Sequence, residues 1–425
     1  MKNALVVGLG KSGMSTARLL AEHSRQVFIT EVKKEDESRV FLGPLIRDNI
    51  VKKENIEFGG HTERFTENID LVVVSPGVKN TALPIKIAQE KNIPVVSELE
   101  LAFSYCPAPI IAITGTSGKT TVTTLIGRML KKAGRRACIC GNIGNPLSGE
   151  IKGLDKDSIV VLEVSSFQLE WINNFRPKVS AILNISTNHL DRHKDMDEYI
   201  SLKMKIFSNQ RDGDILFLNS KDRILKDIRE KVSGPKVEFF NDHLDFRNKL
   251  SIDNEDFQAA MSIASYEGVN EEDMLAVIKE FNGIEHRLEK VRVVDGVQFI
   301  NDSKATTISS VEWALKSLEG KIVLILGGRY KGGDFSRLEP YLEKKVSSIV
   351  AIGEAKERIK SDLKNFSNII EGRTFEEAFN KAVKESRKGD KVLLSPGCSS
   401  FDMFKDYEER GRSFKELCRR LKESR

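Results

Sequence analysis

The sequence predicts an α/β protein of three domains, in which strands alternate with helices. Short apolar runs rich in β-branched residues recur along the chain between helix-like stretches, a pattern typical of sheets buried on both faces. The 425 residues are also too many for one average core, so we expect two or three domains. We place these domains at 1–107, 108–284 and 285–425, and the prolines at 107 and 109 mark the first boundary.

The composition excludes several classes of protein. With 40% hydrophobic and 30% charged residues the chain is globular, and no apolar run approaches the roughly 18 residues of a membrane span, so we expect no membrane insertion. The net charge of +5 is mild, and no aromatic-plus-basic cluster predicts nucleic-acid binding. The N-terminus shows no secretory pattern and the five cysteines show no C-x-x-C spacing, so we expect a cytoplasmic protein.

The first domain opens with an apolar run at residues 4–7, the turn GLGKSG and a helix-like stretch. The turn matches G-x-G-x-x-G with Gly8, Gly10 and Gly13, in the strand–turn–helix setting that gives this motif its meaning. A second strand ends near Glu31, where an acidic residue could bind a ribose hydroxyl. These features predict a Rossmann-like domain, and taken alone they favour a nicotinamide-dependent dehydrogenase.

The second domain opens with the strand IIAIT and the stretch TGTSGKTT at residues 114–121. The usual phosphate loop is G-x-x-x-x-G-K-[ST], but its first glycine would fall at Ile113, so this loop is shorter. Its chemistry is intact, because the glycines let backbone N–H groups wrap a phosphate, the lysine adds a charge and a threonine hydroxyl can reach Mg²⁺. A helix beginning near Thr120 should follow. The expected ATP contacts are Gly115, Thr116, Ser117, Gly118, Lys119, Thr120 and Thr121.

The later predicted strands of the second and third domains are also short apolar runs. Short apolar runs of this kind, with helical stretches between them, predict a P-loop ATPase-like parallel sheet in the second domain and a Rossmann-like third domain. The predicted strands are ACIC (137–140), SIVVLEVSS (158–166), VSAILNIS (179–186) and DILFLN (214–219), then GVQFINDS (296–303), KIVLILGG (321–328), SIVAIG (348–353) and KVLLSPG (391–397).

Six motifs together resemble the Mur ligases, the ATP-dependent amide-forming enzymes of peptidoglycan precursor synthesis. They span all three predicted domains in the family's order, and the last two are the specific ones, since related ligases carry different signatures there. The motifs are the short loop G-x-x-G-K-T-T, GNIG (141–144), LEVSSFQLE (162–170), HLDRH (189–193), NDSKAT (301–306) and SPGCSSFDMFKDYEERG (395–411).

The resemblance implies a monomeric ligase that joins D-glutamate to UDP-N-acetylmuramoyl-L-alanine (UDP-MurNAc-L-Ala). The carboxylate of that substrate would attack the γ-phosphate of ATP, and the amine of D-glutamate would then attack the acyl phosphate. The first step of this reaction brings two anions together, so we expect fixed cations to lower its activation barrier. The alternatives are a sister ligase with another amino acid and a nucleotide-binding module without ligation, although the third domain would have no role in such a module.

The resemblance also implies two Mg²⁺ sites in the second domain. Glu163 and Thr120 would hold one ion, His189 would hold the other, and Lys203 would become a carbamate, an anion able to bridge toward the metal. Without that modification an ammonium would repel the metal. His189 and His193 have the spacing of a zinc pair, but H-E-x-x-H is absent, so zinc is not expected.

Further site residues follow from the resemblance. Arg287 would reach the ATP phosphates, Asp302 the ribose hydroxyls, and Lys304 and Thr306 the reacting carboxylates. The catalytic set would therefore be Lys119, Glu163, His189, Lys203, Arg287 and Lys304. D-Glutamate would contact Lys331, Ser400, Phe401 and Tyr407, and the UDP-linked substrate would contact Ser12, Ser75, Asn142 and Gln168.

The chain departs from the family pattern at several positions. Asn188 stands where the family often has Asp, residues 252–260 lack an H-N-x-x-N helix start, and the chain is shortened at about 236–252. Arg329 stands where an acidic residue is common, so the charge of the amino-acid pocket could differ. These departures leave the adenine contacts and the choice of amino acid open.

Overall fold

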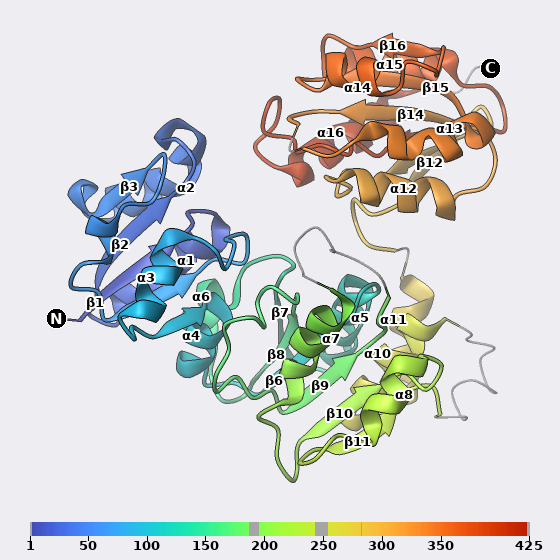
Figure 1. The fold of residues 1–425 in the computed structure, drawn as a ribbon. Helices are drawn as coiled ribbons and strands as arrows, with labels where there is room; N and C mark the ends of the chain where they lie inside the picture. Colours follow the sequence, from blue (N-terminus) through green and yellow to red (C-terminus); the bar gives the residue numbers. More distant parts are fainter. Residues whose placement is uncertain (1, 187–194, 243–253, 282, 331, 423–425) are drawn as a thin grey trace. The chain divides into compact units, whose positions relative to one another are not determined.

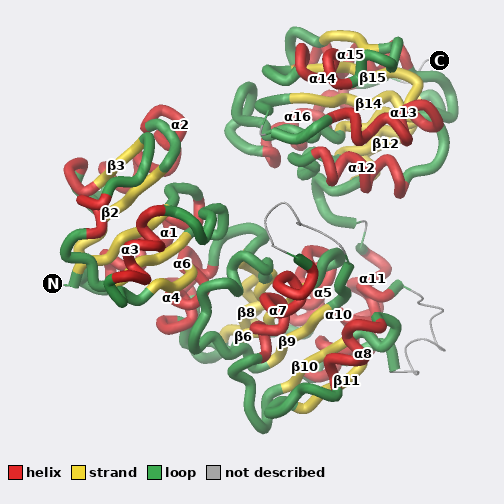
Figure 2. The backbone as a smooth tube through the Cα atoms, in the orientation of Figure 1, coloured by secondary structure: helices red, strands yellow, loops and turns green. Residues whose placement is uncertain are grey.

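The structure is a computed structural model that describes residues 2–186, 195–242, 254–281, 283–330 and 332–422. The chain packs as two compact units, Met1–Glu280 and Phe281–Arg425. Strands alternate with helices along both units, as the ribbon in Figure 1 and the tube in Figure 2 show, and the predicted α/β class is confirmed. The division into three domains at 107/108 and 284/285 stays a prediction. No helix in the described ranges is long and apolar enough to cross a membrane.

The first unit begins with a five-stranded parallel sheet. Its strands are β1 (Asn3–Val7), β2 (Gln26–Glu31), β3 (Ile56–Phe58), β4 (Leu71–Val74) and β5 (Val95–Ser97), and its helices are α1 (Lys11–Glu22), α2 (Glu35–Arg47), α3 (Leu83–Glu90) and α4 (Glu98–Tyr105). The strand order is β3-β2-β1-β4-β5. Successive residues of a strand face opposite sides, so Ala4 and Val6 join a core with α1, α2 and α4, whereas Leu5 and Val7 join one with α3.

The second sheet of this unit carries the predicted phosphate loop. Its strands are β6 (Ile110–Thr114), β7 (Arg136–Gly141), β8 (Ser158–Glu163), β9 (Val179–Ile182), β10 (Ile215–Leu218) and β11 (Lys236–Phe239). All of the neighbouring pairs are parallel, in the order β11-β10-β9-β6-β8-β7. Every residue of β6 is buried, as a central strand of a doubly covered sheet requires.

Helices cover both faces of this second sheet. They are α5 (Lys119–Lys132), α6 (Leu147–Glu150), α7 (Met196–Met204), α8 (Arg223–Arg229), α10 (Glu255–Tyr266) and α11 (Glu271–Glu280). Helix α5 packs on β6, β7 and β8 and is itself covered by α10 and α11. Helix α8 instead shares a core with Ala112, Ile182 and Leu216.

A buried carboxylate ties the two sheets of the first unit together. Glu100 of α4 is 6% exposed and accepts backbone N–H bonds from Asn173 (3.0 Å), Asn174 (2.8 Å) and Phe175 (2.9 Å). These three residues belong to the loop between β8 and β9, whereas α4 covers the first sheet. One apolar core also runs through both sheets, so the unit packs as a whole.

The second unit contains one mixed sheet. Its strands are β12 (Glu289–Val294), β13 (Val297–Asn301), β14 (Ile322–Gly327), β15 (Val346–Ile352), β16 (Ile369–Glu371) and β17 (Lys391–Leu394), in the order β12-β13-β17-β14-β15-β16. Helices α12 (Ile308–Ser317), α13 (Glu339–Lys345) and α14 (Lys356–Asp362) share one core, and α15 (Phe375–Glu385) and α16 (Tyr407–Arg420) share the other.

The edge strand β12 departs from the parallel pattern expected for a Rossmann-like domain. It pairs antiparallel with β13. The two strands are joined by Asp295 and Gly296 alone, with φ of +50° and +78°. A two-residue Asp-Gly connection forms a tight hairpin, and a parallel pair would need a much longer crossover. Residues 289–294 were not among the predicted strands.

The parallel strands direct the predicted site residues to particular edges of the sheets. The phosphate loop follows β6 and Glu163 ends β8, so both lie at the carboxyl edge of the second sheet. Asp302 follows β13 and Ser395 follows β17 at the corresponding edge of the third sheet. Ligands of open α/β sheets bind at such carboxyl edges.

We predict that Glu100→Ala lowers the free energy of unfolding of the first unit by about 3 kcal/mol or more, because three buried N–H groups lose a charged acceptor. Thermal unfolding followed by circular dichroism measures this change. Glu90→Ala, at an exposed position of α3, is the control. Equal unfolding midpoints for the two variants would contradict the assigned role of Glu100.

Candidate active site

Two glycines shape the short phosphate loop between β6 and α5. Gly115 has φ of +153° and Gly118 has φ of +80°, and side chains rarely adopt such conformations. A Cβ at Gly118 would lie 2.2 Å from Oδ1 of Asp256, so the missing side chain also admits a carboxylate from α10. Helix α5 begins at Lys119, one residue before the predicted start near Thr120.

The loop is closed on its own carbonyl groups. Nζ of Lys119 lies 2.9 Å from the carbonyl oxygen of Gly115 and 3.0 Å from that of Thr116. The N–H groups of Thr116 and Ser117 donate to Oδ1 of Asn184 at 3.1 and 2.9 Å. Phosphate oxygens carry charge and are stronger acceptors, so a phosphate would compete for these donors. Sequence reasoning missed Asn184, which lies in VSAILNIS but carries no motif of its own.

A hydroxyl and a carboxylate lie beside the loop. Oγ1 of Thr120 donates to Oε2 of Glu163 at 2.7 Å, and Nδ2 of Asn142 donates to Oε1 at 2.8 Å. Thr120 and Glu163 are each 2% exposed. Adjacent hydroxyl and carboxylate oxygens are hard donors that suit Mg²⁺, so these two residues fit the predicted ion. Asn142 was predicted to contact substrate, and its amide lies on Glu163 here.

Lys203 of α7 is buried against the same loop. Its side chain is 1% exposed, and Nζ donates to the carbonyl oxygen of Gly115 at 2.8 Å and approaches Oγ1 of Thr114 at 3.4 Å. Nζ also lies 4.7 Å from the centre of the Tyr199 ring. Burial lowers the pKa of the Lys203 ammonium well below its usual range, and the charge of Lys119 lowers that pKa further.

Several predicted positions lie outside the described residues. They are His189, proposed for a second metal site, His193 of the zinc-like pair, Asn188, and Lys331, proposed for D-glutamate. The segment 243–253, which includes the start of the altered stretch at 252–260, is also outside them. Thr121 is described, and it is half-buried in the first turn of α5.

The glycine turn of the first sheet is held by a carboxylate. Oε2 of Glu31 accepts the N–H of Leu9 at 2.6 Å, and Oε1 accepts that of Lys33 at 2.9 Å. Glu31 is 5% exposed, so its carboxylate serves the turn rather than a ribose hydroxyl. The dehydrogenase interpretation of GLGKSG thereby loses the acidic residue on which it depends.

The predicted contacts for the UDP-linked substrate fall into two places. Ser12 lies in the first turn of α1, and Oγ of Ser75 donates to the carbonyl oxygen of Gly8 at 2.9 Å, so both flank the glycine turn. Gln168 is 3% exposed and accepts from the N–H and the hydroxyl of Ser165, both at 3.0 Å. Its amide oxygen therefore shapes the loop after β8.

In the second unit, the predicted site residue Asp302 is a buried carboxylate with a raised pKa. Its carboxylate is 4% exposed and accepts from Oγ of Ser395 at 2.7 Å and from the N–H of Leu288 at 3.2 Å. Burial raises the pKa of Asp302 to about 7, although these hydrogen bonds and the charge of Arg287 lower it. Arg287 and Lys304 lie in the same neighbourhood, because the N–H of Lys304 donates to the carbonyl of His286 at 3.0 Å.

A fully buried arginine connects the other predicted residues of this unit. Arg410 is 0% exposed, and it donates to the carbonyl oxygens of Ser303 (2.9 Å) and Cys398 (3.2 Å). Burial lowers the pKa of Arg410 to about 10. Its bonds hold the NDSKAT loop against the loop that carries Ser400. Arg410 lies in the motif at 395–411, but no role was predicted for it from the sequence.

The remaining predicted residues lie near these loops. Thr306 is half-buried, Ser400 is buried and Phe401 is exposed. The carbonyl of Tyr407, the first residue of α16, accepts from Oγ of Ser303 at 2.8 Å. Arg329, noted for its charge, pairs with Glu354 at 3.0 Å. The carboxylate of Glu354 therefore offsets that charge.

The structure thus gathers two sets of predicted residues. In the first unit it brings Lys119, Thr120, Asn142, Glu163 and Lys203 around the phosphate loop. In the second unit it brings Arg287, Asp302 and Lys304 to one carboxyl edge. The first set combines a lysine ammonium that can bind phosphate with hydroxyl and carboxylate oxygens that can bind a metal ion. Phosphoryl transfer requires both kinds of group.

Family models match nearly the whole chain. Residues 2–97 match the MurD-like N-terminal domain of Mur ligases, residues 113–283 the Mur ligase middle domain, and residues 286–398 the Mur ligase glutamate ligase domain.

Curated relatives are similar over the full length. The UDP-N-acetylmuramoylalanine–D-glutamate ligase of Pelotomaculum thermopropionicum is 39% identical over 450 residues, covering 99% of this chain and 98% of the relative. The enzyme of that name from Caldicellulosiruptor bescii is 37% identical over 456 residues, with the same coverage of 99% and 98%.

Solved structures share the fold at low identity. UDP-N-acetylmuramate-alanine ligase MurC from Thermotoga maritima superposes with a TM-score of 0.58 at 16% identity, covering 99% of each chain. A pseudomurein peptide ligase type C from Methanothermus fervidus gives a TM-score of 0.53 at 17% identity, covering 99% of this chain and 100% of the other.

We predict that Asp302 makes the second unit less stable as pH rises. Its folded-state pKa of about 7 exceeds the ordinary value of 3.8, so the folded state binds the proton more tightly. The contribution is greatest below pH 4 and is lost as pH rises toward 7, and at 1.36 kcal/mol per unit it is at most about 4 kcal/mol.

Asp302→Asn removes this titration. Unfolding midpoints at pH 4.5 and pH 7.5 should show the wild type losing stability relative to Asp302→Asn as pH rises. Glu319→Gln, at an exposed position, should follow the wild type. A wild-type-to-Asn difference that does not change with pH would contradict the raised pKa.

Proposed function

This chain belongs to the Mur ligase family, and we propose that it uses ATP to join D-glutamate to the carboxylate of UDP-MurNAc-L-Ala. The proposal rests on the similarity to UDP-N-acetylmuramoylalanine–D-glutamate ligases that are 36–39% identical over nearly the whole chain. The geometry of the phosphate loop supports it, because the loop holds the Lys119 ammonium close to the carboxylate and hydroxyl oxygens of Glu163 and Thr120.

In the first step the substrate carboxylate attacks the γ-phosphorus of ATP, which gives an acyl phosphate and ADP. Both reactants are anions, so the barrier is mainly electrostatic. Lys119 and the N–H groups of Thr116 and Ser117 would bind the phosphates, once these donors leave their present carbonyl and amide acceptors. Mg²⁺, when bound by Thr120 and Glu163, would supply further positive charge at the phosphate oxygens.

In the second step the amine of D-glutamate attacks the acyl carbon. A C–N bond forms, the C–O bond to phosphate breaks, and the amine loses a proton, so the products are an amide and inorganic phosphate. Arg287 and Lys304 would stabilise the anionic groups during both steps, since a guanidinium fork fits phosphate oxygens and an ammonium fits a carboxylate. Lys331, Ser400, Phe401 and Tyr407 would hold D-glutamate.

We also propose that Lys203 is carbamylated in the active protein. In the described part of the chain, the groups that contact its Nζ are a carbonyl, a hydroxyl and an aromatic ring, and none is a carboxylate. A buried ammonium beside Lys119 with neutral partners is unfavourable. The neutral amine can take up CO₂ and release a proton, and the resulting anion would pair with Lys119 and offer oxygen atoms to a second Mg²⁺ together with His189.

The choice of D-glutamate as the amino acid is a separate part of the proposal. A sister ligase with a different amino acid is the alternative, and the ion pair of Arg329 with Glu354 bears on it. Because Glu354 offsets the charge of Arg329, this arginine adds little net positive charge to the predicted amino-acid pocket. We therefore keep D-glutamate as the proposed amino acid, bound by Lys331. A cytoplasmic location suits ATP and a UDP-linked substrate, and both location and the monomeric state stay predictions.

The first experiment is an assay of phosphate release with ATP, Mg²⁺, UDP-MurNAc-L-Ala and single amino acids. We expect release that requires both substrates and is fastest with D-glutamate. Lys119→Ala should lower kcat/KM by roughly 100-fold or more, since it removes a preorganised charge at the phosphates. Lys132→Ala, at the far end of α5, is the control.

Phosphate release that is fastest with another amino acid would support the ligase reaction but show that D-glutamate is not the preferred amino acid. Release without UDP-MurNAc-L-Ala would mean ATP hydrolysis rather than ligation. No release with any pair would contradict the proposed function.

Carbamylation is tested separately. With ¹³CO₂ the protein should show one carbamate carbonyl signal in its NMR spectrum, which Lys203→Ala removes. That variant should lose roughly 100-fold in kcat, and added acetate should restore part of the activity by supplying an anion. Lys205→Ala should keep both the signal and the activity, because Nζ of Lys205 instead donates to the carbonyl of Glu170. A carbamate signal that survives in Lys203→Ala would contradict the assignment.

A further inference from the structure

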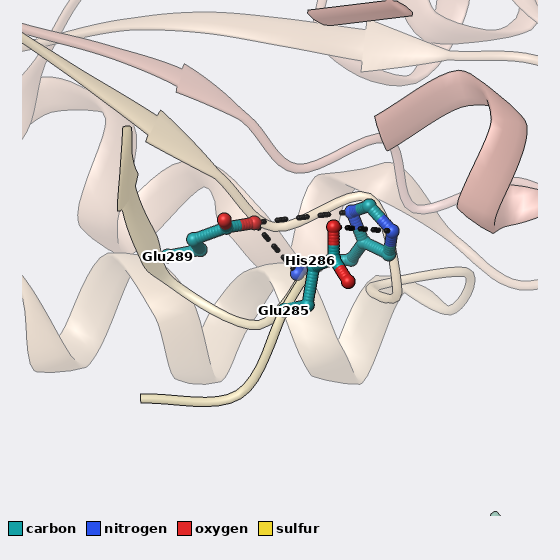
Figure 3. Close-up of side chains that lie close together, drawn as sticks. All are labelled: Glu285, His286 and Glu289. Carbon is teal, nitrogen blue, oxygen red and sulfur yellow. Dashed lines mark hydrogen bonds and ion pairs between the residues drawn. The ribbon is translucent and has the colours of Figure 1, made fainter. Parts of the chain in front are cut away.

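A cluster of two carboxylates and a histidine opens the second unit. Ligand atoms of Glu285, His286 and Glu289 lie within 4.8 Å of one another, and dashed lines in Figure 3 join Glu285 to one ring nitrogen of His286 and Glu289 to the other. The set could hold a metal ion, but Nζ of Lys415 lies 2.9 Å from Oε1 of Glu285 and 2.5 Å from Oε1 of Glu289. The ammonium of Lys415, on α16, therefore bridges the two carboxylates and offsets part of their negative charge, which indicates a structural clamp.

This cluster surrounds a strained turn. His286 has φ of +64° and Leu288 has φ of +42°, so two residues with side chains adopt the left-handed region on either side of Arg287. Such conformations are unfavourable for L-residues and persist where the surroundings enforce them. The turn is closed by a bond of 3.1 Å from the N–H of Arg287 to the carbonyl of Ile284.

Glu289 supplies much of that enforcement. Its Oε2 accepts the backbone N–H of His286 at 2.9 Å and Nδ2 of Asn301 at 3.0 Å. Nδ2 of Asn301 also lies 2.8 Å from Nδ1 of His286. A Cβ at Gly411 would lie 2.2 Å from that nitrogen, so the imidazole rests directly on the backbone of α16. His286 is 4% exposed and Asn301 is 0% exposed, and the turn is therefore anchored in the core.

The same turn carries groups assigned to the reaction. Arg287 lies at its centre. The N–H of Leu288 donates to Oδ1 of Asp302 at 3.2 Å, and the carbonyl of His286 accepts from the N–H of Lys304 at 3.0 Å. A shift of the turn would therefore move Arg287 relative to both Asp302 and Lys304. Displacements of about 1 Å at such groups are enough to lower rates strongly.

We propose that Glu289, with its charge balanced by Lys415, is a positioning residue that fixes the strained turn and thereby aims Arg287 at the nucleotide. The inference rests on the proposed function for the role of Arg287. Glu289 itself touches the turn and Asn301, and it acts through Arg287. Nζ of Lys415 donates to Oε1 of Glu289 at 2.5 Å, which orients the Glu289 carboxylate so that Oε2 faces the two donors.

The test is a double-mutant cycle on the full chain. Glu289→Gln should raise KM for ATP about tenfold and lower kcat, whereas KM for UDP-MurNAc-L-Ala should stay within about twofold. In the Arg287→Ala background the same substitution should change neither value further, because the group through which Glu289 acts is already gone. A merely structural role would lower the active fraction and kcat in both backgrounds with every KM unchanged.

Lys415 gives a second, independent pair of variants. Lys415→Met should reproduce part of the Glu289→Gln effect, and Lys415→Arg should restore the wild-type KM for ATP. Arg412→Met is the matched control, since Arg412 lies on the same helix and forms an exposed ion pair with Glu408. Additive effects of Glu289→Gln and Arg287→Ala, or an unchanged KM for ATP in Lys415→Met and Glu289→Gln, would overturn the proposal.

Equilibrium binding of ATP separates this inference from the proposed function. If the wild type binds ATP but forms no amide, the proposed function is wrong. The double-mutant cycle can then still be measured with the Kd for ATP in place of KM. Glu289→Gln should then weaken ATP binding in the wild-type background and not in Arg287→Ala. A wild type that does not bind ATP would overturn both.

Discussion

The carbonyl oxygen of Gly115 accepts from two lysine ammonium groups, and the phosphate loop depends on that shared contact. Lys119 reaches it from the start of α5 and Lys203 from α7, at 2.9 and 2.8 Å. Two cations on one neutral oxygen in a buried place repel each other, so the site favours anions or the loss of a charge. Triphosphate binding and carbamylation of Lys203 both relieve the same repulsion.

Carboxylates that are buried or half-buried hold several loops of the molecule in place. Glu31 holds the glycine turn, Glu100 joins the two sheets of the first unit, and Glu289 holds the turn around Arg287. Each accepts backbone N–H bonds, and bonds to an ionised acceptor are about twice as strong as neutral ones. The turns that Glu31 and Glu289 hold are thus kept in fixed shapes, which would preorganise the groups that they carry for the proposed reaction.

Local sequence patterns predicted most of the strands and helices. The β-branched runs at 110–114 and 158–163 predicted buried strands, whereas β3, β5 and β16 have three residues each and no period to detect. The short loop predicted a nucleotide site because spacing alone places its glycines, lysine and threonine. Asn184 and Arg410 escaped prediction because their partners lie 68 and 107 residues away, so that their roles exist in the folded chain alone. The burial of Lys203 likewise depends on packing, since a helix lysine has no sequence signal for it.

The central claim is that the chain activates a carboxylate by phosphorylation and then forms an amide. Transfer of ¹⁸O tests it most directly. UDP-MurNAc-L-Ala labelled with ¹⁸O in its terminal carboxylate should pass one labelled oxygen to inorganic phosphate for each amide formed, because the bridging oxygen of the acyl phosphate leaves with the phosphorus. Unlabelled phosphate formed together with the amide, or label recovered in AMP, would contradict the mechanism.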